Sequence, residues 1–142
     1  MPKFGKTSER NLLLVDNKLK EVMYEAIADC PVDFGVSYGH RTTTAQQQLY
    51  AQGRTQPGKI VTNIDGVHKL SKHNYNPSKA VDIVIADKTK AYDEATLAFV
   101  AGWIMATAKR LNIDITWGGN WDNDYTILTD QKLIDMPHFE ID

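Results

Sequence analysis

The chain has only one thiol, because Cys30 is the only cysteine among its 142 residues. A single cysteine excludes an internal disulfide and cannot supply the several thiolates of a cysteine-based zinc cage. Cys30 falls on the apolar side of an expected helix, so we interpret it as a core residue rather than a nucleophile. The chemistry of the chain must therefore come from other side chains.

Long apolar runs and an excess of either charge are also missing. No stretch approaches the ~18 apolar residues of a membrane span, and the start, Met1-Pro2-Lys3-Phe4, lacks the apolar segment of a signal peptide. We therefore expect no membrane insertion and synthesis in the cytoplasm. Sixteen basic residues stand against eighteen acidic ones, which leaves no basic stripe for nucleic acid. Length and composition indicate one domain over residues 1–142, expected to be a monomer.

The spacing of apolar residues predicts three helices and four strands. Asp16 is the expected N-cap of the first helix, and Thr43 with Gln46 has the form of a capping box for the second. Helices are expected at 16–30, 43–52 and 93–111, and strands at 34–38, 81–86, 113–117 and 137–141. Because the helices come early and the strands gather late, we predict an α+β fold with a small, mostly antiparallel sheet flanked by helices.

Two histidines and an aspartate form a candidate metal site. Asp82 lies in an apolar strand, where a carboxylate is costly unless it is paired or bound to a metal. Side chains alternate along a strand, so Asp82 and His138 meet on one face if their strands are neighbours, and His73 can fold over from the preceding loop. Three protein ligands with a fourth position open are typical of catalytic zinc.

Each of these residues also has an ordinary interpretation. Asp82 could cap a turn or pair with Lys79, and His138 alone would be taken as a hydrogen-bonded core histidine. His40 and His68 fit no ligand pattern and are treated as non-ligands. The three candidates together outweigh the ordinary interpretations.

Carboxylates and an arginine surround the candidate ligands. Asp135 precedes His138 by three residues and is placed to act as a general base, although a simple turn aspartate is the alternative. Glu140 could orient a ligand or could be an exposed strand carboxylate. Arg41 can hold a carboxylate or a developing oxyanion, with a surface salt bridge as the alternative.

Four segments are informative in combination. They are Gly39-His40-Arg41-Thr42 with residues 46–55, Ser71-Lys72-His73 with Ala80-Val81-Asp82, Trp117-Gly118-Gly119-Asn120-Trp121, and Asp135-Met136-Pro137-His138-Phe139-Glu140. In this order they resemble motifs of the D-Ala-D-Ala carboxypeptidase (VanY-like) superfamily of zinc peptidases, and most closely its phage L-alanyl-D-glutamate endopeptidases, which act as endolysins. Each segment alone is weak, whereas four in order across nearly the whole chain are specific.

This resemblance implies a Hedgehog/D-Ala-D-Ala peptidase-like fold and a role for each motif. It implies one Zn²⁺ held by His73, Asp82 and His138, with Asp135 as the catalytic base and Arg41 on the substrate or the oxyanion. Substrate binding is also expected of Gln47, Ser71 and His68, which lie in or beside the motifs. The chain departs from the family pattern in the longer stretch 76–79 before Asp82, and in Asn120, where an aspartate is common.

The resemblance also implies a substrate and a place of action. The expected reaction is hydrolysis of the L-alanyl-D-glutamate bond in peptidoglycan stem peptides. The enzyme would wait in the host cytoplasm until the membrane is opened, and would then act on the cell wall. Two alternatives have the same fold: a D,D-carboxypeptidase that removes terminal D-alanine, and an inactive wall-binding module. Sugar binding by Trp117, Trp121 and Tyr125, with a calcium loop at Asp122 and Asp124, is disfavoured because no full EF-hand pattern exists there.

Overall fold

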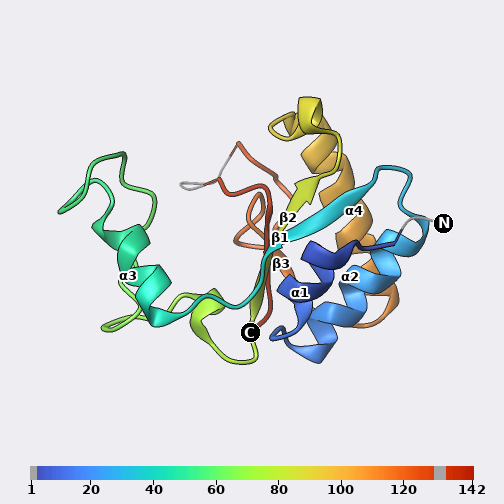
Figure 1. The fold of residues 1–142 in the computed structure, drawn as a ribbon. Helices are drawn as coiled ribbons and strands as arrows, with labels where there is room; N and C mark the ends of the chain where they lie inside the picture. Colours follow the sequence, from blue (N-terminus) through green and yellow to red (C-terminus); the bar gives the residue numbers. More distant parts are fainter. Residues whose placement is uncertain (1–2, 130–133) are drawn as a thin grey trace.

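The computed structural model describes residues 3–129 and 134–142 (Figure 1). Its helices are α1 (Lys6–Leu12), α2 (Asn17–Asp29), α3 (Thr43–Ala51) and α4 (Glu94–Arg110), with short 3-10 helices η1 (Lys72–Asn74) and η2 (Lys88–Lys90). Its strands are β1 (Phe34–Tyr38), β2 (Ala80–Ile85), β3 (Thr116–Trp117) and β4 (His138–Glu140). The helices and strands together confirm the predicted α+β class.

The strands form one four-stranded sheet in the order β1-β2-β4-β3. Every neighbouring pair is antiparallel, as predicted. The two strands expected to carry ligands are neighbours, and Asp82 on β2 lies directly opposite His138 on β4. The register of this one pair therefore decides that the two side chains share a face of the sheet.

The two faces of the sheet have opposite characters. Val81, Ile83 and Phe139 are at most 2 % exposed and belong to one apolar core with α2 and α4, which lie on that side of the sheet in Figure 1. Because side chains alternate along a strand, Asp82 and His138 point to the other face. Burial of the first set holds the second set in place.

Two helix ends explain where the observed elements differ from the expected ones. The predicted capping box at Thr43 is wrong: Thr42 is the N-cap of α3, and its hydroxyl accepts a hydrogen bond from the amide of Ala45. The expected strand 113–117 is observed only as Thr116–Trp117, because α4 ends in a Schellman motif that reaches to Ile113. Asn112 has a φ of 61°, and the amide of Ile113 donates to the carbonyl of Ala108.

Helix α1 was not expected from the sequence, since it is short and buries little beyond Leu12 and Ser8. The Ser8 hydroxyl accepts a hydrogen bond from the amide of Val36, which ties α1 to the edge strand β1. The N-cap role of Asp16 in α2 is confirmed by its bond from the Lys18 amide. Cys30 is 2 % exposed and belongs to the core, as expected.

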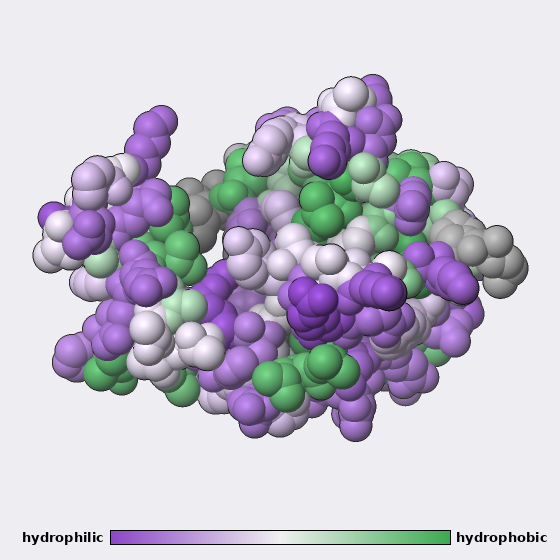
Figure 2. Space-filling model, viewed as in Figure 1, coloured by the Kyte–Doolittle hydropathy of each residue, from purple (hydrophilic) through white to green (hydrophobic). Residues whose placement is uncertain are grey.

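Helix α3 and the segment that follows it form a lobe beside the sheet, on the left of Figure 1. Figure 2 shows the same lobe set apart from the body by a notch, with apolar side chains on its inner side. Within the described residues, no helix has the length and apolar character needed to cross a membrane.

Gly118 joins the sheet to the turn that carries Asp135. Its amide donates to the carbonyl of His138, and its own carbonyl accepts from the amide of Asp135, at 2.8 and 2.9 Å. A Cβ atom at Gly118 would lie 1.9 Å from the carbonyl oxygen of Asp135. No side chain fits there unless the turn moves.

We therefore predict that Gly118→Ala destabilises the protein by about 1–3 kcal/mol, the usual cost of overpacking, and displaces Asp135. Gly102→Ala is the matched control, because a Cβ there meets nothing within 4 Å and alanine favours a helix interior by about 0.5–1 kcal/mol. Urea unfolding of both variants measures the difference. A Gly118→Ala variant as stable as the parent would show that the turn accommodates a side chain without cost.

Candidate metal centre

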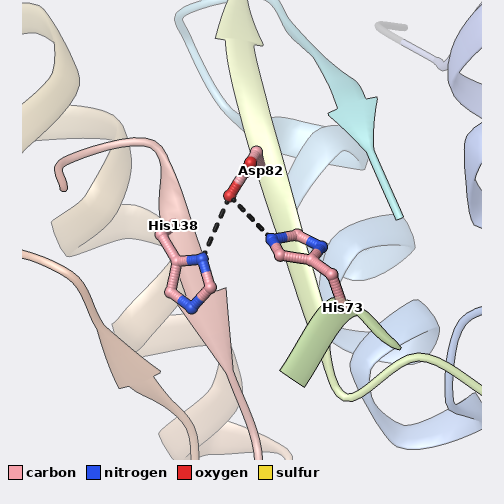
Figure 3. A group of neighbouring side chains, drawn as sticks. All are labelled: His73, Asp82 and His138. Carbon is pink, nitrogen blue, oxygen red and sulfur yellow. Dashed lines mark hydrogen bonds and ion pairs between the residues drawn. The ribbon is translucent and has the colours of Figure 1, made fainter. Parts of the chain in front are cut away.

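His73, Asp82 and His138 converge on one point, as Figure 3 shows. The Oδ1 atom of Asp82 lies 3.3 Å from Nε2 of His73 and 3.1 Å from Nδ1 of His138. One ligand atom from each residue lies within 4.8 Å of the other two, so this group could hold a metal ion. The structure thus brings together the three residues singled out as ligands.

His73 is held from behind by the backbone. It lies in η1, where the Ser71 hydroxyl accepts from the His73 amide and Asn74 completes a capping box. Its Nδ1 atom lies 2.7 Å from the carbonyl oxygen of Gly39. A carbonyl only accepts, so the Nδ1 nitrogen carries the hydrogen and Nε2 turns a lone pair toward Asp82. Gly39 itself packs closely against α1, because a Cβ there would lie 2.1 Å from the carbonyl oxygen of Asn11.

His138 has an acceptor on each side of its ring. Its Nε2 atom lies 2.8 Å from Oε1 of Glu140, and its Nδ1 atom faces Asp82. The ring of Trp121 covers it, with centroids 5.3 Å apart. The side chain of His138 is only 9 % exposed, so water reaches little of this arrangement.

These contacts point to a cation between the three side chains. A neutral imidazole has one N–H, so each ring that donates on its far side presents a bare lone pair to the Asp82 carboxylate. Only a proton or a metal ion removes that conflict. Zinc bonds of roughly 2.0–2.2 Å in a tetrahedron place ligand atoms about 3.4 Å apart. The two distances to Asp82, 3.3 and 3.1 Å, fit this spacing.

Without a metal, a proton on His138 takes the place of the cation. Burial alone would raise the pKa of Asp82, but its contacts with the imidazoles of His138 and His73 outweigh burial and hold that pKa well below its ordinary value. Burial likewise opposes protonation of His138, yet hydrogen bonds to Asp82 and Glu140 raise its pKa to about 9. In the metal-free site, protonated His138 and ionised Asp82 therefore form an ion pair, and the proton lies where a metal ion could bind.

Asp135 lies on the open side of the cluster. Its Oδ2 atom is 4.0 Å from Nδ1 of His138, and its side chain is 47 % exposed. Burial, and then the charge of Asp82, raise the pKa of Asp135 above its ordinary value, although His138, His73 and Arg41 pull it down. A carboxylate that faces solvent beside the ligands, with a raised pKa, is suited to accept a proton.

Arg41 reaches the same cleft and is oriented by a residue that the sequence analysis missed. The Nη1 atom of Arg41 donates to Oε1 of Gln46 at 3.0 Å, and Nε2 of Gln46 donates to the carbonyl of Ile64 at 2.8 Å. Gln46 is 1 % exposed. No carboxylate among the described residues pairs with Arg41. The alternative interpretation, a surface salt bridge, is therefore not observed in this part of the chain.

The cleft that joins these groups has a volume of about 760 Å³. One wall is the metal cluster with Asp135 and Trp121, and the other is the lobe of α3. The residues around it are Tyr38, Arg41, Gln46, Leu49, Ile60–Ile64, Lys69–His73, Asp82, Trp121, Asp135, His138 and Glu140. The candidate ligands therefore lie in a cleft large enough for a short peptide.

Three expected substrate residues are placed differently from one another. Ser71 lines the cleft, but its hydroxyl caps η1. Gln47 is exposed on α3 outside the cleft, and its neighbour Gln46 takes the inward position. His68 also lies outside the cleft: its side chain is 89 % exposed and its Nδ1 atom is 2.6 Å from Oδ2 of Asp65. The structure therefore does not bring Gln47 or His68 to the site.

The two departures from the family pattern leave the cluster intact. The longer stretch 76–79 is anchored at Ser78, whose amide donates to the carbonyl of Leu14 and whose carbonyl accepts from Asp16. Among the described residues Asp82 pairs with His73 and His138 rather than with Lys79, whose ammonium lies 4.7 Å from the centre of the Tyr75 ring. Asn120 is 2 % exposed and accepts a hydrogen bond from the amide of Tyr125.

Comparisons with known proteins agree with one another. The family model described as phage L-alanyl-D-glutamate peptidase matches residues 1–141. The peptidoglycan L-alanyl-D-glutamate endopeptidase CwlK of Bacillus subtilis (strain 168) is 28 % identical over 127 residues, which cover 85 % of this chain and 68 % of CwlK. The crystal structure of the Serratia marcescens L-Ala D-Glu endopeptidase ChiX aligns with a TM-score of 0.72 and 25 % identity, over 99 % of this chain and 91 % of ChiX.

The proton held by His138 makes metal binding dependent on pH. Because the pKa of His138 is raised to about 9, the metal-free protein carries this proton at neutral pH, and a metal must expel it. We predict release of about one proton per zinc near pH 7, and an apparent affinity that rises with pH up to about 9. Calorimetric titration in buffers of different ionisation enthalpy measures both. An affinity that stays constant between pH 7 and 9 would contradict the assignment.

Proposed function

The chain belongs to the phage L-alanyl-D-glutamate peptidase family, and we propose that it hydrolyses the L-alanyl-D-glutamate bond of peptidoglycan stem peptides with one zinc ion held by His73, Asp82 and His138. The observation that carries this proposal is the convergence of the two imidazoles on Oδ1 of Asp82, beside the open carboxylate of Asp135. Nitrogen and carboxylate ligands with an open position favour zinc over calcium or magnesium, which prefer oxygen alone.

The residues around the cluster have distinct roles in this reaction. A zinc ion bound there supplies Lewis acidity toward a water molecule and toward the scissile carbonyl. Asp135 takes a proton from the attacking water at its carboxylate and returns it to the leaving amine of D-glutamate. Arg41 binds a substrate carboxylate or the developing oxyanion, and Gln46 fixes the direction of its guanidinium.

The same family membership supports a role in lysis. In this proposal, residues 1–142 form one catalytic domain that acts as a monomer on the host cell wall once the membrane has been opened. The D,D-carboxypeptidase alternative is less well supported, because both relatives described above are named as L-alanyl-D-glutamate endopeptidases. The inactive wall-binding alternative is disfavoured by the presence of Asp135 beside the cluster.

Mass spectrometry of purified peptidoglycan after digestion tests the proposed bond. We expect new peptides that begin at D-glutamate, a loss of this product when a chelator is present, and its return when zinc is added. Release of terminal D-alanine alone would move the protein to the carboxypeptidase reaction. Absence of any cleavage by the zinc-loaded protein would favour the binding module.

We predict that Asp135→Asn lowers kcat by roughly 10²–10⁴-fold, the usual contribution of a general base, while zinc stays bound. His138→Ala should lose both zinc and turnover, because it removes a ligand. Asp114→Asn is the control, since this aspartate is exposed and lies outside the cleft. Zinc content and stem-peptide turnover are measured on the same samples, and parental turnover by Asp135→Asn would refute its role as the base.

A further inference from the structure

Glu140 has no role in the reaction described above, yet at 2.8 Å its carboxylate makes the shortest hydrogen bond of the His138 ring among the described residues. We propose that Glu140 is a positioning residue that holds the hydrogen of His138 on Nε2, so that Nδ1 is the atom that binds the metal. The inference rests on the proposed zinc site and adds to it the identity of the ligating nitrogens, Nε2 in His73 and Nδ1 in His138.

The position of Glu140 follows from the strand that carries it. Glu140 is two residues after His138 on β4, and it pairs with Ala80 on one side and with Thr116 on the other. Residues two apart point to the same face, which brings Oε1 of Glu140 to 2.8 Å from Nε2 of His138. The geometry of β4 therefore presents the carboxylate to the ring without any loop rearrangement.

The carboxylate has no competing partner in the described part of the chain. Its side chain is 20 % exposed, and its ion pair is with His138. No lysine or arginine within residues 3–129 and 134–142 pairs with it. A half-buried carboxylate whose charge is met only by an imidazole is well placed to accept the ring hydrogen.

Glu140 and Asp135 contact opposite nitrogens of the same ring. Asp135 is near Nδ1, at 4.0 Å, on the side of the ligand cluster, whereas Glu140 is at Nε2, on the far side. Glu140 therefore acts through His138, and Asp135 acts on the substrate side. The contact belongs to a general arrangement in which a carboxylate behind a ligating imidazole fixes its tautomer and makes it a stronger ligand.

The two histidines are supported by acceptors of different strength. Behind His73 stands the neutral carbonyl of Gly39 at 2.7 Å, and behind His138 stands a carboxylate. Loss of the carboxylate should therefore weaken the His138 bond to the metal without changing His73. This asymmetry makes the inference testable at a single ring.

The test compares the full chain with its Glu140→Gln and Glu140→Ala variants. Glu25→Gln is the control, because Glu25 is exposed on α2 and does not line the cleft. Zinc affinity is measured by competition with a chromogenic chelator. We expect Glu140→Ala to bind zinc roughly 10–100-fold more weakly. Glu140→Gln should lose less, because its amide oxygen still accepts the hydrogen. Glu25→Gln should match the parent.

A second readout identifies the ligating nitrogen directly. Long-range ¹H–¹⁵N correlation spectra of the zinc-loaded parent should show His138 with its hydrogen on Nε2 and His73 with its hydrogen on Nδ1. A hydrogen on Nδ1 of His138, or parental zinc affinity in both Glu140 variants, would overturn the inference. If the parent itself binds no zinc, the proposed function fails first, which separates the two failures. Thermal unfolding of the metal-free variants controls for folding, and Glu140→Gln keeps the shape of the side chain.

Discussion

In the candidate metal centre, two imidazoles turn onto a single carboxylate oxygen, Oδ1 of Asp82. Each ring is tied back by an acceptor on its far side, His73 by the carbonyl of Gly39 and His138 by Glu140. Their remaining nitrogens therefore meet at Oδ1 of Asp82. Buried lone pairs that face one another are unfavourable, so a proton or a metal ion between them stabilises the cluster.

The sheet and its tightly packed backbone place these side chains. The antiparallel pairing of β2 with β4 sets Asp82 opposite His138, and the apolar residues between them, such as Phe139, are locked into the core with α2 and α4. Gly39 and Gly118 allow the backbone to approach more closely than any side chain would permit. Packing on one face of the sheet thus sets the positions of polar atoms on the other face to within the tolerance of metal ligation.

Much of this could be predicted from the sequence because it depends on periodicity. Alternation along strands placed Asp82 and His138 on one face, and helical spacing located α2 and α4 within a residue or two. The remainder depends on tertiary contacts that leave no local signal. Thr42 rather than Thr43 caps α3, since Gln46 is drawn inward to Arg41 and Ile64 and is not available for a capping box.

The same reason explains the residues that were placed differently. Three glutamines follow one another in α3, and only the direction of the helix decides that Gln46 faces the cleft while Gln47 faces solvent. Trp117 packs in the core with its indole N–H on the carbonyl of Met136, but Trp121, four residues later, lies against His138 in the cleft. The two tryptophans are separated by a Gly-Gly turn. The local sequence does not indicate which of them is in the core and which is in the cleft.

A crystal structure of the zinc-soaked protein, with anomalous data collected on both sides of the zinc absorption edge, tests the proposed metal centre most directly. We expect one strong anomalous peak at roughly 2.0–2.2 Å from Nε2 of His73, Oδ1 of Asp82 and Nδ1 of His138, with Asp135 near the ion but not bound to it. A peak at another place, or a site closed by Asp135 as a fourth protein ligand, would contradict it.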